Sequence, residues 1–112
     1  MFNISSIYHK PDGHKTDEYR FDFDYYLNTH MPMSIELLSK AKGFRGVSVE
    51  RGIDIDNPPL PSAFVAMCHY YFDTVEDFVN AFMPHAAQLQ GDIPNYTNLE
   101  PKIQINEVAI KR

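Results

Sequence analysis

The sequence predicts a single α+β domain in which two helices cover one face of a four-stranded antiparallel sheet. Four segments show strand patterns and two segments between them show a helical period, in the order strand, helix, strand, strand, helix, strand. The length of 112 residues is typical of one compact domain, and 44% hydrophobic residues are enough to build a core. We therefore expect one domain over residues 1–112.

The first strand is predicted over Phe2–Lys10. The segment FNISSIYHK is rich in β-branched and aromatic residues, which favour extended structure. It stops at Pro11-Asp12-Gly13, a combination that is typical of a turn.

The first helix is predicted from Phe21 onward, where the spacing of apolar residues changes. One helical face collects the residues at i, i+3, i+4 and i+7, namely Phe23, Tyr26, Leu27 and His30. Pro32 lacks an N–H group, so the helix is either kinked there or ends and restarts with Pro32 in its first turn. The second part points Ile35, Leu38 and Ala41 inward and stops at Gly43.

Two strands are predicted next. In Phe44–Gly52, Val47 and Val49 alternate with polar residues, which indicates a strand with one solvated face. A proline-containing loop follows, and the strand after it, Ala63–Phe72, is apolar or aromatic at nearly every position. Such a strand needs cover on both faces.

The second helix begins after an N-cap at Asp73 or Thr74, with Thr74 and Asp77 at capping-box spacing. Pro84 interrupts this helix and Gly91 ends it. Its apolar stripe consists of Val75, Phe78, Val79, Phe82, Ala86 and Leu89. An irregular connection then leads to a last strand over Lys102–Ile110, with Ile103 and Ile105 on one side.

This β-α-β-β-α-β order predicts a ferredoxin-like sandwich. A domain of this size cannot leave an aromatic sheet face in water without creating an adhesive patch. We therefore expect a homodimer in which two sheets pack face to face around a twofold axis.

Charge and cysteine content narrow the functional classes. The net charge of −5, without a run of basic residues, gives no electrostatic footprint for nucleic acid or an anionic membrane. Cys68 is the single cysteine and cannot form an internal disulfide, and no long apolar run resembles a signal peptide or a membrane span. A cytoplasmic location is expected.

Three segments together resemble the EthD family: YYLNTHMPM around His30, the PHA triplet at Pro84, and GDIPNYTNLEP from Gly91 to Pro101. The resemblance spans essentially the whole chain. It implies a dimeric α+β barrel and an accessory role in the oxidative degradation of an organic compound by a monooxygenase system. Relatives in the wider superfamily include isomerases, cyclases and cofactor-free monooxygenases, which hold a small ligand between the sheet and the helices.

His30 is the candidate catalytic residue. A histidine on an apolar helical face is either a buried ring satisfied by a neighbouring polar group or a functional group. Two features favour function: the ring lies just before the break at Pro32, and a histidine titrates near neutral pH and can act as a general acid or base. The resemblance also implies that this histidine looks toward the cleft.

The candidate ligand-binding residues are Tyr8, Tyr26, His69, His85 and Tyr96. Tyr8 and Tyr26 also fit as ordinary core aromatics, and His85 fits equally as an exposed histidine at the start of a helix. Cys68 and His69 are adjacent on one strand and so point to opposite faces, and which of these faces the cleft is undecided. Asp92 and its asparagine neighbours have the composition of a structural turn, although the resemblance brings Tyr96 close to the cleft or the dimer.

No metal ion or cofactor is expected, because the histidines and the cysteine lack zinc-site spacing and no nucleotide-binding or hydrolase motif is present. Two functions stay open. The first is a small-molecule-binding protein, accessory to or part of an oxidative catabolic pathway. The alternative is a cofactor-free isomerase, cyclase or monooxygenase acting on an apolar compound with His30 as general acid or base. A structural dimer whose cleft is filled by its own side chains is a third, simpler reading.

Overall fold

A computed structural model describes residues 1–11 and 19–112, and its four-stranded antiparallel sheet has the order β2-β5-β1-β6. The strands are β1 (Phe2–His9), β2 (Phe44–Arg51), β5 (Phe64–Phe72) and β6 (Lys102–Glu107). This is the ferredoxin-like order, so the predicted fold class is confirmed. The predicted turn at Asp12 and Gly13 lies outside the described residues.

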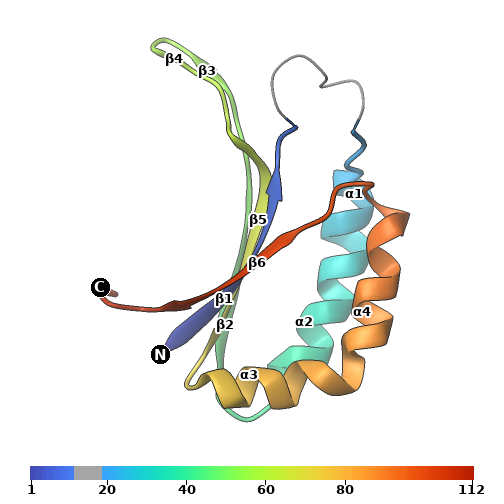
Figure 1. The fold of residues 1–112 in the computed structure, drawn as a ribbon, viewed down its shortest axis with the longest axis vertical. Coiled ribbons are helices and arrows are strands. Elements are labelled where there is room, and N and C mark those ends of the chain that lie inside the picture. Colours follow the sequence, from blue (N-terminus) through green and yellow to red (C-terminus); the bar gives the residue numbers. More distant parts are fainter. Residues whose placement is uncertain (12–18) are drawn as a thin grey trace.

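The helices all lie on one face of the sheet (Figure 1). The first helical region consists of α1 (Phe23–Tyr25), a π turn (Tyr26–His30) and α2 (Met31–Ser39). The second consists of α3 (Val75–Phe82), a 3₁₀ turn (Met83–His85), α4 (Ala86–Asp92) and a second 3₁₀ turn (Ile93–Asn95). Each of the two predicted helices is thus present but divided into shorter pieces.

The π turn explains how the first helical region accommodates Pro32. The Met31 N–H donates to the Tyr26 carbonyl, five residues back, and Pro32 then occupies the first turn of α2. The helical backbone is continuous from α1 to α2, and α2 begins at Met31 with Pro32 in its first turn. Of the second predicted alternative, only this position of Pro32 is confirmed, since the helix does not end before it. The widened turn also changes which side chains face inward, since Tyr26 and His30 are buried whereas Leu27 is 42% exposed. The prediction that Leu27 lies on the buried stripe was wrong because it assumed a regular 3.6-residue period.

The start of α3 is capped as predicted, because the Thr74 hydroxyl accepts a hydrogen bond from the Asp77 N–H at 3.0 Å. Pro84 falls in the 3₁₀ turn between α3 and α4, where its missing N–H is tolerated. Two details were wrong. Val79 is 42% exposed, and Gly91 lies inside α4, which continues to Asp92.

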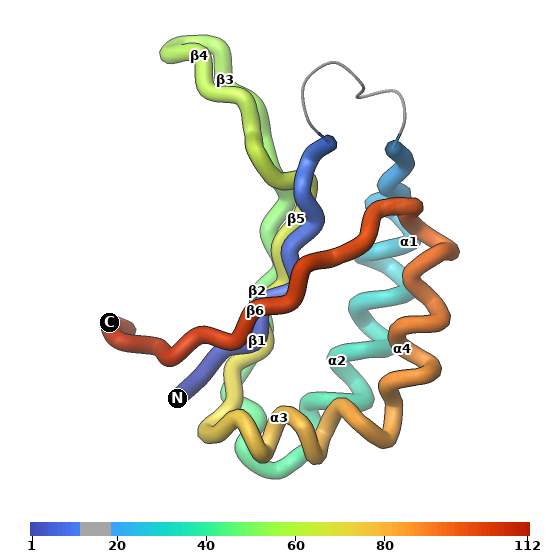
Figure 2. The backbone as a smooth tube through the Cα atoms, viewed as in Figure 1, coloured from blue at the N-terminus to red at the C-terminus, as the bar shows by residue number. Residues whose placement is uncertain are grey.

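Two short strands, β3 (Ile55–Asp56) and β4 (Pro59–Leu60), form a hairpin where a loop was expected. This hairpin extends beyond the main sheet (Figure 2). The last strand ends at Glu107 instead of Ile110. Within the described residues, none of the helices has the length and apolar character needed to cross a membrane.

The two faces of the sheet differ in chemistry. The face toward the helices carries Ile4 and Tyr8 of β1 and Tyr70 and Phe72 of β5, all buried. The opposite face has no helix over it among the described residues (Figure 1). A row of hydrogen-bonded polar side chains crosses this uncovered face and consists of Asn106, Asn3, Ser5, His69 and Glu50.

Candidate functional site

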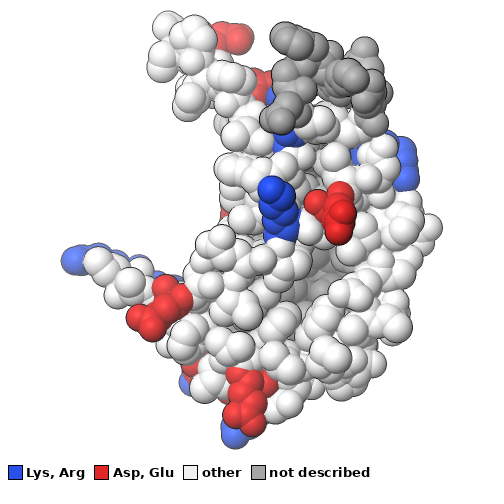
Figure 3. All heavy atoms as spheres, in the orientation of Figure 1, with Lys and Arg blue, Asp and Glu red and all other residues white. Residues whose placement is uncertain are grey.

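A cavity of about 530 Å³ lies between the sheet and the helices. In the space-filling view, a hollow opens on the face turned to the reader (Figure 3). The walls are mainly apolar, with contributions from Ile4, Leu38, Phe78, Phe82 and Leu89. The volume is within the range of small-molecule sites, so the space could enclose a compact organic molecule.

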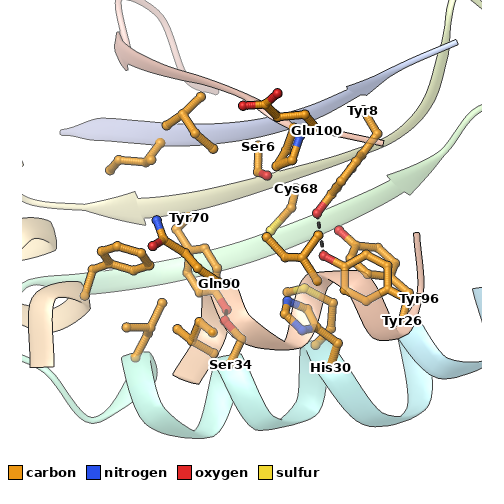
Figure 4. Close-up of a pocket in the computed structure, with 18 of the residues that line it drawn as sticks. Ser6, Tyr8, Tyr26, His30, Ser34, Cys68, Tyr70, Gln90, Tyr96 and Glu100 are labelled. Carbon is orange, nitrogen blue, oxygen red and sulfur yellow. Dashed lines mark hydrogen bonds between the residues drawn. The ribbon is translucent and has the colours of Figure 1, made fainter. Parts of the chain in front are cut away.

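His30 contributes its ring to the wall of this cavity (Figure 4). The residue ends the π turn, and its side chain is 9% exposed. Its Nδ1 atom is 2.9 Å from Asp92 Oδ2, which fixes the ring through one nitrogen. With Nδ1–H donated to Asp92, the tautomer has a free lone pair on Nε2. A neutral His30 in this form could accept a proton from a bound molecule.

Asp92 at the end of α4 is held by several donors. Its Oδ1 atom accepts hydrogen bonds from the Tyr25 hydroxyl at 2.7 Å and from the Asn95 amide at 2.8 Å. Partial burial raises the pKa of Asp92, but hydrogen bonds from Tyr25, His30 and Asn95 outweigh that effect and keep it below its usual value. The carboxylate is therefore ionised at neutral pH and able to stabilise a positive charge on His30.

Three tyrosines surround His30 at one end of the cavity. The Tyr8 and Tyr96 hydroxyls are hydrogen-bonded to each other across the site (Figure 4). The Tyr96 ring centroid lies 4.7 Å from that of His30, and Tyr26 stacks on His30 at 5.9 Å. Burial is the main cause that raises the pKa of all three phenols, so they are neutral hydrogen-bonding groups at physiological pH.

Further along the cavity, the hydroxyls of Ser34 and Tyr70 lie 2.6 Å apart and satisfy each other. Cys68 also lines the cavity, on the same sheet face as Tyr70. Burial raises the pKa of the Cys68 thiol to about 12. The thiol is therefore protonated at neutral pH and behaves as a small apolar group.

The structure brings together some of the predicted residues and separates others. His30, Tyr8, Tyr26 and Tyr96 line one cavity. His69 points to the uncovered sheet face, where its Nδ1 atom is 2.6 Å from Ser5 Oγ and its Nε2 atom is 3.0 Å from Glu50 Oε1.

His85 lies in the 3₁₀ turn between α3 and α4 and does not line the cavity. The predicted ligand contacts of His69 and His85 therefore gain no support from this cavity. The open question about the strand Ala63–Phe72 is answered, because the face of Cys68 is the one toward the cavity.

Sequence reasoning missed Asp92 as the partner of His30 and assigned it to a turn. The two residues are 62 positions apart, and no local pattern connects them. Gln90 and Glu100, which were not among the predicted residues, also line the cavity. Glu100 belongs to the GDIPNYTNLEP segment, but that segment was interpreted as a turn and only Tyr96 was assigned to the cleft. Among the described residues, no group of three histidine, cysteine or acidic side chains is arranged to hold a metal ion.

These features define a small α+β sandwich protein with a mainly apolar cavity and one histidine in its wall, which is paired with an aspartate behind it. The chain belongs to the EthD family, whose domain matches residues 15–100. No match was found among curated proteins.

Three solved structures are similar. An EthD-like protein from Ralstonia eutropha JMP134 is 37% identical, with a TM-score of 0.82 over 99% of this chain and 94% of that one. An ethyl tert-butyl ether D (EthD) family protein from Bacillus halodurans C-125 is 23% identical, with a TM-score of 0.65 over 96% and 97% of the two chains. A Bordetella bronchiseptica protein named as an antibiotic biosynthesis monooxygenase is 16% identical, with a TM-score of 0.55 over 97% and 96%, which supports the fold alone.

Proposed function

We propose that this protein binds a small, mainly apolar organic molecule in the cavity between its sheet and its helices. The observation that carries the proposal is the cavity itself, with about 530 Å³ of space and walls of aliphatic and aromatic side chains. A domain core is normally packed without voids of this size, so a space left open favours a ligand over a purely structural role. The further expectation of an accessory role in an oxidative catabolic pathway rests on the family resemblance.

Binding is tested with the neutral fluorescent probe N-phenyl-1-naphthylamine. We expect its emission to rise when it enters the apolar cavity. Ser6 lines the cavity, so Ser6→Phe should fill part of the space and weaken binding by roughly tenfold or more. Gln88→Phe adds the same ring on the exposed side of α4 and should leave binding unchanged. Equal binding by the wild type and a folded Ser6→Phe variant would contradict the proposed location.

A second function, proton transfer without a cofactor, is favoured by the His30–Asp92 pair. Asp92 holds Nδ1 at 2.9 Å and can stabilise the imidazolium that forms when Nε2 takes up a proton. In this candidate, His30 removes a proton from a bound compound and returns it to the same or to another atom, which makes the reaction an exchange or an isomerisation.

Proton transfer is tested with 2-tetralone, a neutral ketone with acidic C–H groups, by following its hydrogen–deuterium exchange by NMR in D₂O. The wild type should accelerate exchange above the buffer rate. His30→Gln should reduce that acceleration by roughly a hundredfold, whereas His9→Gln, at the exposed end of β1, should not. If 2-tetralone binds but exchanges at the buffer rate, the binding function stands and this proton transfer does not.

A further inference from the structure

We propose that the cavity selects uncharged ligands over carboxylates, and that Glu100 at its mouth is a specificity-determining residue. The inference rests on the proposed binding function and adds the chemical class of the ligand to it. It is based on two observations: the cavity lining contains the carboxylate of Glu100, and it contains no lysine or arginine among the described residues.

Among the described residues that line the cavity, none is a lysine or an arginine. Burial raises the phenol pKa values of the four tyrosines in the lining and keeps the Cys68 thiol protonated at neutral pH, so these groups are uncharged. The tyrosines are Tyr8, Tyr26, Tyr70 and Tyr96. The remaining ionisable side chains in the lining are those of His30 and Glu100. A carboxylate that enters the cavity would lose its hydration without gaining a fixed positive partner.

His30 does not supply that missing charge. A proton on both ring nitrogens would make the imidazole positive, but Asp92 lies 2.9 Å from Nδ1 and is ionised. The pair then has a net charge of zero. A ligand carboxylate would therefore meet the field of two opposite charges close together, which largely cancel.

Glu100 adds a negative charge at the opening. The residue is exposed, lies in the connection that leads into β6, and lines the cavity from the side of the sheet (Figure 4). Lys102 follows two residues later, but it pairs in register with Ile7, does not line the cavity and so offers no cation to its wall. Figure 3 shows a basic side chain next to an acidic one above the hollow.

The experiment compares two probes of nearly equal shape at pH 7.5, neutral 2-naphthamide and anionic 2-naphthoate, by isothermal titration calorimetry on the full chain. The wild type should bind 2-naphthamide at least roughly tenfold more tightly than 2-naphthoate, because the carboxylate loses hydration and meets a like charge. The measured quantity is the ratio of these two affinities. Glu100→Gln should narrow this ratio, and Gln90→Glu, which adds a charge to the lining, should widen it.

Two matched variants make the same changes away from the cavity. Glu107→Gln removes an exposed charge from β6, and Gln88→Glu adds one to the exposed side of α4; both should leave the ratio unchanged. Equal affinity of the wild type for both probes would overturn the selectivity and leave ligand binding intact. An unchanged ratio in Glu100→Gln, with the amide still bound, would overturn the role of Glu100. If neither probe binds, the proposed function fails together with the inference.

Discussion

At the scale of single residues, the site depends on how one carboxylate orients one imidazole. Asp92 accepts hydrogen bonds from three side chains that come from three different segments: Tyr25, His30 and Asn95. Such a carboxylate cannot rotate freely, and the His30 ring is fixed with it. The same contacts couple the candidate chemistry to the stability of the fold.

This coupling predicts how stability depends on pH. The pKa of Asp92 is lower in the folded chain than its usual value. A lowered pKa stabilises the fold above the unfolded value of about 4 and loses that contribution as the pH falls through the folded pKa. We expect Asp92→Asn to cost about 1 kcal/mol of unfolding free energy at pH 7. The difference from the wild type should shrink between about pH 5 and pH 3.

Urea unfolding followed by circular dichroism across this pH range measures the effect. Asp24→Asn, which changes an exposed carboxylate in the first helical region, is the matched control. Its unfolding free energy should depend on pH in the same way as that of the wild type. If the difference in unfolding free energy between the wild type and Asp92→Asn stayed constant down to pH 3, the assignment of the lowered pKa to Asp92 would be contradicted.

The residue scale also shows what a sequence can predict about a site. His30 could be found because its helical spacing and the nearby Pro32 are local signals. Asp92 could not be found in the same way, since it reaches His30 only when the end of α4 lies beside the π turn. Glu100 faces the cavity for a similar reason, through the path of the connection into β6.

At the scale of elements, the sequence predicted every strand of the main sheet and both helical regions. Alternation, proline positions and the capping residues Thr74 and Asp77 are short-range features, and short-range physics decides where an element begins. One error lies where the backbone departs from an ideal period: a regular helical count placed Leu27 on the buried face, and this residue lies in the π turn. The other error has a different cause. Val79 lies inside the regular helix α3, where the predicted apolar stripe was wider than the face that is buried.

The π turn carries two residues of the site, Tyr26 and His30, and both are buried against the sheet. It also lies directly before Pro32, which cannot donate a hydrogen bond to the preceding turn. Residues four positions apart share a face in a regular helix as well, so the inward direction of these two rings follows from their spacing. The side chain that the regular count places wrongly is that of Leu27, which is 42% exposed.

At the scale of the whole molecule, we propose that the uncovered sheet face is a self-association surface. The face carries partly exposed apolar side chains on its two central strands, Ile7 of β1 with Met67 and Tyr71 of β5. The polar side chains of its row form hydrogen bonds with one another within a single chain. Ser5 and His69 are hydrogen-bonded to each other, and the Asn106 amide donates to both Asn3 and Ser5. Covering these groups with a second sheet would thus leave few of them without partners.

The proposed self-association surface predicts the mass of the protein in solution. Size-exclusion chromatography with light scattering at micromolar concentration should return twice the 12.9 kDa of one chain. Met67→Lys should shift the protein to a monomer, because a twofold axis through this face brings the new charge close to its own copy or buries it without a partner. Gln88→Lys adds the same charge on the helical side and should leave the dimer intact. A wild-type protein that stays monomeric would show that the polar row is enough to keep this face in water, and the apolar side chains beside it would then need no cover.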